Sequence, residues 1–296
     1  MPSRRQIREA AIQFLYCYDL EGGVLPPDLR APFWDFVTES DRKNLQVAIY
    51  RTVHHLANGR EARLVEFVER SETAAAHLTA HPPAESLQNI LRRLLALESS
   101  WSLAFSQMER IPRDGDDADV ADSLENSLEK LFKIDRDLAF NREQFLNEAG
   151  NFPTLKAHTE AVAASIRRLQ RISERLRMVE EPEKFPEQAD LGKLRDSQTE
   201  ITELRLRTDE LVDAVLASKE AVDGKLAAIL DNYQPERIDP VDRAILRLGT
   251  YELLFTNTPQ NAVINEAVEL AKRFGTSDSK RFVNGLLDRV AKDTKP

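Results

Sequence analysis

The strongest constraint on the fold is a seven-residue repeat of apolar side chains in the middle of the chain. The residues of two such series are Leu124, Leu131, Leu138 and Phe145, followed by Leu155, Val162, Leu169 and Leu176. A repeat of this period favours long helices that pack nearly parallel or antiparallel along one seam. The sequence GNFP between the two series, at residues 150–153, predicts the tip of a helical hairpin. We therefore expect an all-α fold.

The rest of the chain also reads as helix. Apolar side chains recur at helical spacing from Ser3 to Leu20 and near the C-terminus. Asp239 followed by Pro240 predicts a helix start, Gly275 predicts a helix end, and Ser277 is a candidate cap for the last helix. Further helices are expected at 33–38, 41–57, 62–78 and 84–110. Three long helices are expected in the middle, with a connector after residue 180.

Composition places the chain among intracellular helical proteins. Hydrophobic residues make up 42% of the 296 residues, which is enough for a core, and charged residues make up 31%. No apolar run reaches the length of a membrane span, and the N-terminus lacks a secretory signal, so we expect a cytoplasmic protein with no membrane contact. Cys17 is the only cysteine, which excludes an internal disulfide and a thiolate metal cluster.

The net charge of −9 argues against a chain that binds nucleic acid over its whole surface. The excess acidity lies between residues 60 and 220, which contain 23 basic and 32 acidic residues. The two ends together contain 18 of each sign. A local basic patch on the terminal segments is therefore compatible with the composition.

No motif for catalysis, a cofactor or a metal is found. The chain has no Walker loop, no dinucleotide fingerprint and no nucleophile elbow, and its five histidines lack a metal spacing. Asp114, Asp116 and Glu125 match three positions of a calcium loop, but Asp119 stands where the loop needs glycine. We interpret this stretch as an acidic loop before a helix. Cys17 is interpreted as a core residue.

The first helix carries a strip of cationic and aromatic side chains. The residues that share it are Arg5, Arg8, Ile12 and Tyr16, with Arg4 at the near end. Arginine binds phosphate with two parallel hydrogen bonds, and an aromatic ring beside it can stack on a base. This combination is typical of sites for single-stranded RNA. The alternative is an ordinary solvated helix start.

Segments at both ends resemble one family. RRQIREAAIQFLYCYDL, from Arg4, is similar to the opening helix of the NusB family of transcription antitermination factors. The segments VDRAILRLGTYELLF, INEAVELAKRFG and SKRFVNGLLDRV resemble the C-terminal signature of that family, in order and at the expected spacing. The resemblance is dense from Asp231 onward. Tyr233 stands where the family often has tryptophan.

The resemblance implies an all-helical fold of two packed halves and a protein without catalytic activity. It also implies binding of boxA-type single-stranded RNA, jointly with ribosomal protein NusE, in transcription elongation complexes on ribosomal RNA operons. The implied RNA-contacting residues are Arg4, Arg5, Arg8, Tyr16, Asp278, Lys280, Arg281 and Phe282. The implied NusE-facing residues are Asp242, Tyr251 and Glu252. If the first and last helices pack side by side, Lys280 and Arg281 extend the arginine strip. Phe282 has a core position as its alternative.

The chain is about twice as long as this family requires. We predict a NusB-like N-terminal half at 1–58, an inserted acidic helical arm at 59–220, and a NusB-like C-terminal half at 221–296. The arm is expected to be an interaction arm or a shield with an unknown partner, not a second RNA platform.

Two other functions remain open. The first is a scaffold of the same fold that has lost RNA binding, which the acidic arm favours. The second is an enzyme, because similar domains precede ribosomal RNA cytosine methyltransferases. The chain lacks the glycine-rich cofactor loop and the cysteine pair that this chemistry uses.

Overall fold

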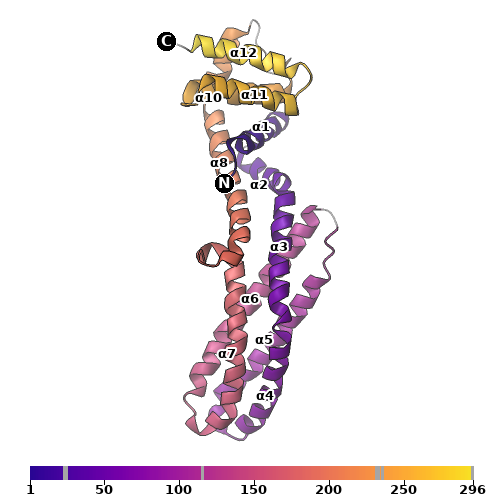
Figure 1. Cartoon of the computed structure of the whole chain (residues 1–296), viewed down its shortest axis with the longest axis vertical. Helices are drawn as coiled ribbons and strands as arrows, with labels where there is room; N and C mark the ends of the chain where they lie inside the picture. Colours follow the sequence, from indigo (N-terminus) through magenta and orange to yellow (C-terminus); the bar gives the residue numbers. More distant parts are fainter. Residues whose placement is uncertain (23–25, 115–116, 231–233, 235–236, 295–296) are drawn as a thin grey trace. The chain divides into compact units, whose positions relative to one another are not determined.

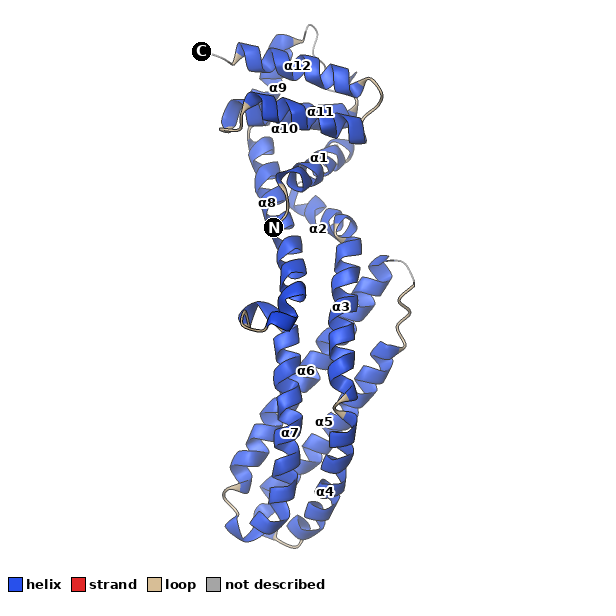
Figure 2. Ribbon diagram, in the orientation of Figure 1, coloured by secondary structure: helices blue, strands red, loops and turns tan. Residues whose placement is uncertain are grey.

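The computed structural model describes residues 1–22, 26–114, 117–230, 234 and 237–294. These residues form twelve α-helices and four short 3-10 turns without a β-strand, which confirms the all-α prediction (Figure 2). Asp116 of the calcium-loop alternative and Tyr233 lie outside the described residues. Within the described ranges, no helix has both the length and the apolar composition of a bilayer span.

The backbone divides into two compact units. Unit 1 contains residues 1–38 and 199–296, and unit 2 contains residues 39–198. These boundaries lie about 20 residues before the sequence-based ones at 58 and 220. The helix at 41–57 therefore belongs to unit 2, and the segment 199–220 belongs to unit 1. The three-part division with an inserted arm stays a prediction.

Unit 1 is organised around one apolar helix. Its helices are α1 (Arg4–Leu20), α2 (Pro26–Val37), residues 199–217 of α8 (Gly192–Ala217), α9 (Lys219–Ile229), α10 (Pro240–Phe255), α11 (Gln260–Phe274) and α12 (Ser279–Asp293). Every residue from Ala244 to Thr250 of α10 is buried. Helices α1, α9, α11 and α12 all pack on α10 (Figure 1). The core of unit 1 is therefore built around α10.

Unit 2 contains the heptad helices. They are α3 (Glu39–Asn58), α4 (Glu61–Thr79), α5 (Glu85–Glu109), α6 (Asp117–Ala149) and α7 (Lys156–Glu180), followed by the first residues of α8. Helix α6 packs on α3, α5 and α7, and α4 packs on α7 (Figure 1). All eight residues of the two predicted heptad series are at most 2% exposed. This burial confirms the seam that the heptads predict.

Unit 2 also buries a network of charged side chains. The carboxylate of Glu98 in α5 accepts hydrogen bonds from the guanidinium groups of Arg60 and Arg142. Arg142 also donates to Ser173 Oγ at 2.6 Å, and Ser173 Oγ donates to the carboxylate of Asp135 at 2.9 Å. All five side chains are at most 5% exposed. Burial lowers the pKa of Arg60 and raises the pKa of Asp135, so desolvation acts strongly on both groups.

The ends of the C-terminal helices follow most of the predicted signals. Asp239 Oδ1 accepts a hydrogen bond from the backbone N–H of Val241 at 2.9 Å, which confirms the predicted cap of α10. The prediction of Ser277 as the cap of α12 is wrong. The cap position is Asp278, and the hydroxyl of Ser279 instead accepts from the backbone N–H of Thr276 at 2.8 Å.

Candidate nucleic-acid interface

The start of α1 is fixed by a capping box. The hydroxyl of Ser3 accepts a hydrogen bond from the backbone N–H of Gln6, and the side chain of Gln6 accepts from the backbone N–H of Ser3 at 2.7 Å. This arrangement begins the helix at Arg4. The three predicted arginines therefore lie in its first two turns.

These three arginines have different environments. Arg8 is 7% exposed, and its guanidinium donates to both carboxylate oxygens of Glu252 in α10 at 2.9 and 3.1 Å. Arg5 makes a two-fold contact with Glu266 of α11 at 2.9 and 3.0 Å, and its side chain stays 53% exposed. Arg4 is exposed and has no ion-pair partner among the described residues. Only Arg4 is wholly available to a ligand.

The predicted strip on α1 is consequently wrong in part. Ile12 is 3% exposed, so Arg8 and Ile12 belong to the buried face and do not lie beside it. Arg8 is buried because Glu252 offers it a carboxylate inside the seam between α1 and α10. A pattern of residue types within one helix contains no information about a carboxylate 244 positions away.

The far end of α1 is held by a second ionic cluster. Asp19 accepts hydrogen bonds from Arg243 at 2.6 Å and from Arg247 at 2.8 and 2.9 Å. Arg247 also donates to Asp223 of α9 at 2.9 Å. Burial alone would lower the pKa of Arg247, but the hydrogen bonds to Asp223 and Asp19 raise it. This cluster fixes α1 and α9 against α10.

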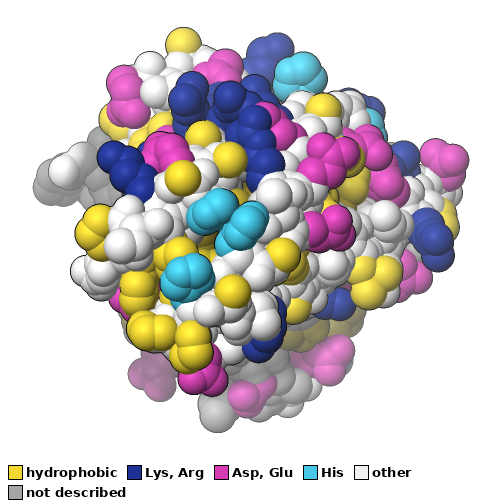
Figure 3. Space-filling model, turned by 90° about the horizontal axis from the view of Figure 1, so that it is seen from below, with side chains coloured by type: hydrophobic (Ala, Val, Ile, Leu, Met, Phe, Trp, Pro, Cys, Tyr) yellow, Lys and Arg dark blue, Asp and Glu magenta, His cyan; other side chains and the backbone are white. Residues whose placement is uncertain are grey.

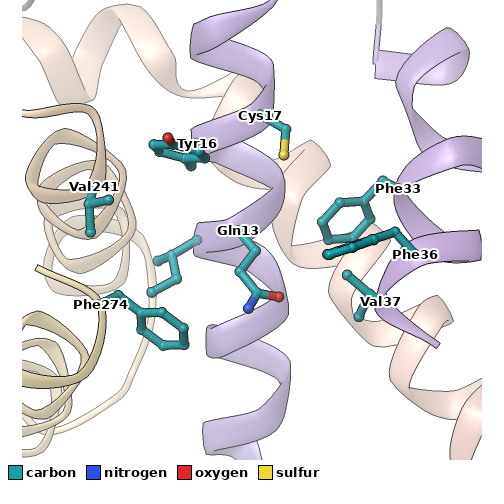
Figure 4. A pocket seen from close by; sticks show the side chains of 9 residues that line it. Gln13, Tyr16, Cys17, Phe33, Phe36, Val37, Val241 and Phe274 are labelled. Carbon is teal, nitrogen blue, oxygen red and sulfur yellow. The ribbon is translucent and has the colours of Figure 1, made fainter. Parts of the chain in front are cut away.

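Tyr16 lies at an apolar pocket of about 290 Å³. The pocket is lined by residues of α1, α2, α10 and α11, among them Gln13, Phe36 and Phe274 (Figure 4). Phe36 is 78% exposed, which is unusual for a large apolar side chain. Tyr16 therefore lies beside an apolar pocket, most of whose walls come from residues that the sequence pattern did not single out. Phe274, at the end of α11, is one of these residues.

The corner between α11 and α12 exposes the predicted cations. Lys280 and Arg281 are exposed and have no ion-pair partner among the described residues, and Asp278 beside them is exposed too. Phe282 is 36% exposed, so its alternative as a core residue is not what the structure shows. Ser279, between Asp278 and Lys280, is buried, and its hydroxyl oxygen would lie 2.5 Å from a Cβ at Gly275. The corner is closely packed inside and cationic outside.

The first and last helices do not pair as expected. Helix α1 packs on α10 and α2, whereas α12 packs on α9, α10 and α11, and Figure 1 shows α11 between α1 and α12. The arginines at the start of α1 and the cations at the corner between α11 and α12 are connected along the seam between α1 and α11. Arg5 contacts Glu266 and Arg273 contacts Glu9, so the two helices run in the same direction along it. The side chain of Arg273 is 63% exposed and adds a cation that the sequence prediction missed.

The three predicted partner-facing residues do not form one patch. Asp242 is in the first turn of α10, and Tyr251 and Glu252 are near its end. Tyr251 lines a cavity of about 540 Å³ with Arg4, Arg207 and Thr258, and its ring contacts that of Phe255 at 5.6 Å. Asp242 and Glu252 are both 7% exposed. Tyr251 is therefore the accessible member of the three.

Asp242 lies inside the corner, and the cost of ionising its buried carboxyl group gives a testable pH dependence. Burial raises the pKa of its carboxyl group, although a hydrogen bond with Ser279 opposes the shift. A carboxyl group with a raised folded-state pKa destabilises the fold above that pKa, and the penalty disappears below the unfolded value of about 4. We expect Asp242→Asn to raise the unfolding temperature at pH 7, on the order of 2 °C. The gain should vanish below about pH 4, and a gain that is independent of pH would show that it does not come from the ionisation of Asp242.

Comparison with known proteins places the chain in a family. A model of the NusB family matches residues 169–292. The transcription antitermination protein NusB of Elusimicrobium minutum is 46% identical over 87 residues, which are 29% of this chain and 62% of that protein. The NusB protein of Syntrophotalea carbinolica is 42% identical over 105 residues, which are 35% of this chain and 67% of that protein. A solved structure of T. maritima NusB has 35% identity, covers 35% of this chain and 78% of its own, and gives a TM-score of 0.30.

These matches leave much of the chain outside the similarity. The family match begins in α7, before the predicted boundary at 220. The chain spans less than two thirds of the Elusimicrobium minutum protein, but it spans two thirds of the Syntrophotalea carbinolica protein at 42% identity. On this similarity, the chain belongs to the NusB family.

Proposed function

We propose that the protein is an RNA-binding transcription antitermination factor. It binds boxA-type single-stranded RNA together with ribosomal protein NusE, in elongation complexes on ribosomal RNA operons, and acts in the cytoplasm without catalysis. The observation that carries the proposal is that Arg4, Lys280 and Arg281 are exposed cations without a carboxylate partner among the described residues. In a chain with a net charge of −9, unpaired cations at both ends of one seam favour an anionic ligand.

The chemistry between these cations suits single-stranded RNA. Arg5 and Arg273 stay partly exposed along the seam between α1 and α11, where they can contact successive phosphates. The apolar pocket beside Tyr16 and Phe274 and the exposed ring of Phe282 offer surfaces on which unstacked bases can lie. Double-stranded nucleic acid cannot present its bases in this way. The arrangement therefore supports a single strand.

The surface around Tyr251 supports the second partner. Tyr251 and the 51% exposed Phe255 provide aromatic area, which is enriched at the centres of protein interfaces. The neighbouring cavity also contains Arg4, so a protein bound there would lie next to the proposed RNA. We propose this surface as the NusE contact. Glu252 acts from inside, where its ion pair with Arg8 holds α1 against α10.

The double variant Lys280→Gln/Arg281→Gln tests the RNA site. Loss of two phosphate contacts should weaken binding of a boxA-like RNA roughly tenfold to fiftyfold near 0.1 M salt, and should reduce the logarithmic salt slope by about 1.4. Fluorescence anisotropy over a series of salt concentrations measures both values. The matched control is Arg289→Gln/Lys292→Gln, which removes the same charge from the exposed face of the same helix.

The outcomes separate the proposal from its alternative. Equal effects of the two double variants, or equal binding of a scrambled RNA, would count against a specific RNA site at the corner. Binding of NusE without any binding of RNA would instead support the scaffold that has lost RNA binding.

A further inference from the structure

Unit 2 carries a cationic face that its overall composition hides. Arg63 and Arg70 of α4 and Arg167, Arg168 and Arg171 of α7 form this set, which we call the arginine face. Arg63 Nη1 donates to the backbone carbonyl of Arg168 at 3.4 Å, and Arg70 Nη1 donates to Ser165 Oγ at 3.0 Å. These contacts hold α4 beside α7. Arg171 is four positions after Arg167 and three after Arg168, so it is a neighbour of each of them on the surface of α7.

Carboxylates neutralise only part of this face. Glu66 contacts both Arg70 at 2.5 Å and Arg168 at 2.7 Å, and Glu160 contacts Arg167 at 3.2 Å. The hydrogen bond from Arg168 lowers the pKa of Glu66, which favours its ionised form. Its single negative charge balances only one of the two arginines that it contacts. Among the described residues, the ion pairs of these five guanidinium groups involve two carboxylates. Unit 2 as a whole has 23 basic and 28 acidic residues, so the face has the opposite sign to its unit.

The arginine face is accessible. The side chains of Arg167 and Arg168 are 55% and 47% exposed, and Arg171 is exposed without an ion-pair partner among the described residues. Figure 3 shows Lys and Arg side chains gathered beside histidines. The rings of His77 in α4 and His158 in α7 stack at 3.7 Å between centroids, so two histidines also lie along the seam between these helices.

The absence of exposed Phe, Tyr and Trp side chains from the arginine face indicates which kind of anionic partner it suits. Phe67 is the only Phe, Tyr or Trp of α4 and α7, and it is 1% exposed. The face therefore lacks exposed Phe, Tyr and Trp rings, and the only other rings of α4 and α7 are those of the two histidines, which already stack on each other. It also lacks the buried aromatic anchors that dominate protein interfaces. What remains is a set of guanidinium groups on two rigid helices, which suits an array of phosphates with fixed geometry.

We propose that the arginine face binds the phosphate backbone of double-helical RNA. A-form RNA is recognised through its phosphates and shape, and arginine contacts phosphate with two parallel hydrogen bonds. This surface is in addition to the single-strand site of unit 1, and the inference does not depend on that site. It also reverses the expectation that the middle of the chain is not an RNA platform. That expectation was based on the average charge and not on its distribution.

A blunt RNA duplex of about 16 base pairs, the length that a duplex-binding domain spans, is the probe. The full chain should bind it with a steep salt dependence in anisotropy measurements. Arg167→Gln/Arg171→Gln should weaken binding roughly tenfold or more near 0.1 M salt. Arg92→Gln/Arg93→Gln removes the same charge from exposed positions of α5 and should change the affinity less than about twofold, because no phosphate contact is lost.

Further outcomes decide the assignment. Lys280→Gln/Arg281→Gln in unit 1 should leave duplex binding unchanged. The duplex experiment therefore tests the arginine face independently of the proposed single-strand site. Equal affinities of the two unit 2 double variants for the duplex would overturn the proposal. Displacement of the duplex by poly-glutamate at equal charge concentration would also overturn it, because it would indicate that the ligand of this face is an acidic protein. Arg171 forms no ion pair among the described residues, so Arg171→Gln alone gives the same test at about half the logarithmic effect if the double variant unfolds.

Discussion

Replacing Glu98 by glutamine is expected to destabilise unit 2 by about 3–5 kcal/mol. Glu98 is 2% exposed and is the shared carboxylate of Arg60 and Arg142, which are 3% and 1% exposed. Without it, two buried cations remain with one carboxylate, Asp135, and this group reaches Arg142 only through Ser173. The guanidinium of Arg60 would then retain its contact with the Trp101 ring, whose centre lies 3.8 Å away. A ring cannot replace a carboxylate in a buried site.

The two tryptophans of the chain allow this effect to be assigned. Trp34 lies in unit 1 and Trp101 in unit 2, so a Trp34→Phe background reports unit 2 alone during unfolding in urea. Glu72→Gln on the exposed surface of α4 is the matched control and should change the free energy of unfolding by less than about 0.5 kcal/mol. Similar unfolding midpoints for the two variants would show that the network is not required for the stability of unit 2.

The second large effect is expected in unit 1. Arg8→Met should lower its stability by about 3–5 kcal/mol, because Glu252 would remain as a buried carboxylate without a cation. Adding Glu252→Leu should restore most of the loss, since a well-packed apolar pair can replace a buried ion pair. The double-mutant cycle therefore separates the coupling of the pair from the individual contributions of its members.

Unfolding of the Arg8 variants is followed by Trp34 fluorescence in a Trp101→Phe background. Arg4→Gln is the contrasting variant: it should leave stability unchanged and lower the affinity for boxA-like RNA. If Arg8→Met kept full stability and lost RNA affinity as Arg4→Gln does, the assignment of Arg8 to the interior would be wrong. The measurements thus distinguish an arginine that holds the fold from one that is available to a ligand.

Periodic features of the sequence predicted the elements of the fold well. The heptads of α6 and α7 predicted residues such as Leu124 and Leu176, which are at most 1% exposed. Capping chemistry predicted the start of α10 at Asp239. Such signals succeed because burial along one helix face and the first turn of a helix are local properties of the chain.

Contacts between distant segments were not predictable in the same way. Arg8 and Glu252 each look like surface residues in their own helices, and both are buried because they meet. The separation of α1 from α12 by α11 likewise depends on how three helices cross. The arginine face escaped prediction because its members lie about 100 positions apart and their charge is averaged with acidic neighbours. Tertiary proximity decides each of these features.

One glycine sets the distance between the centre of unit 1 and its cationic corner. A Cβ on Gly249 of α10 would lie 2.7 Å from Cδ1 of Leu287 in α12, and the Leu287 side chain is fully buried. Alanine would therefore require the Leu287 side chain to change its rotamer or the two helices to separate. Lys280 and Arg281 are in the same helix as Leu287, about two turns earlier, so a displacement of that helix would move them too. A position that no ligand can touch thus limits where these two charges stand.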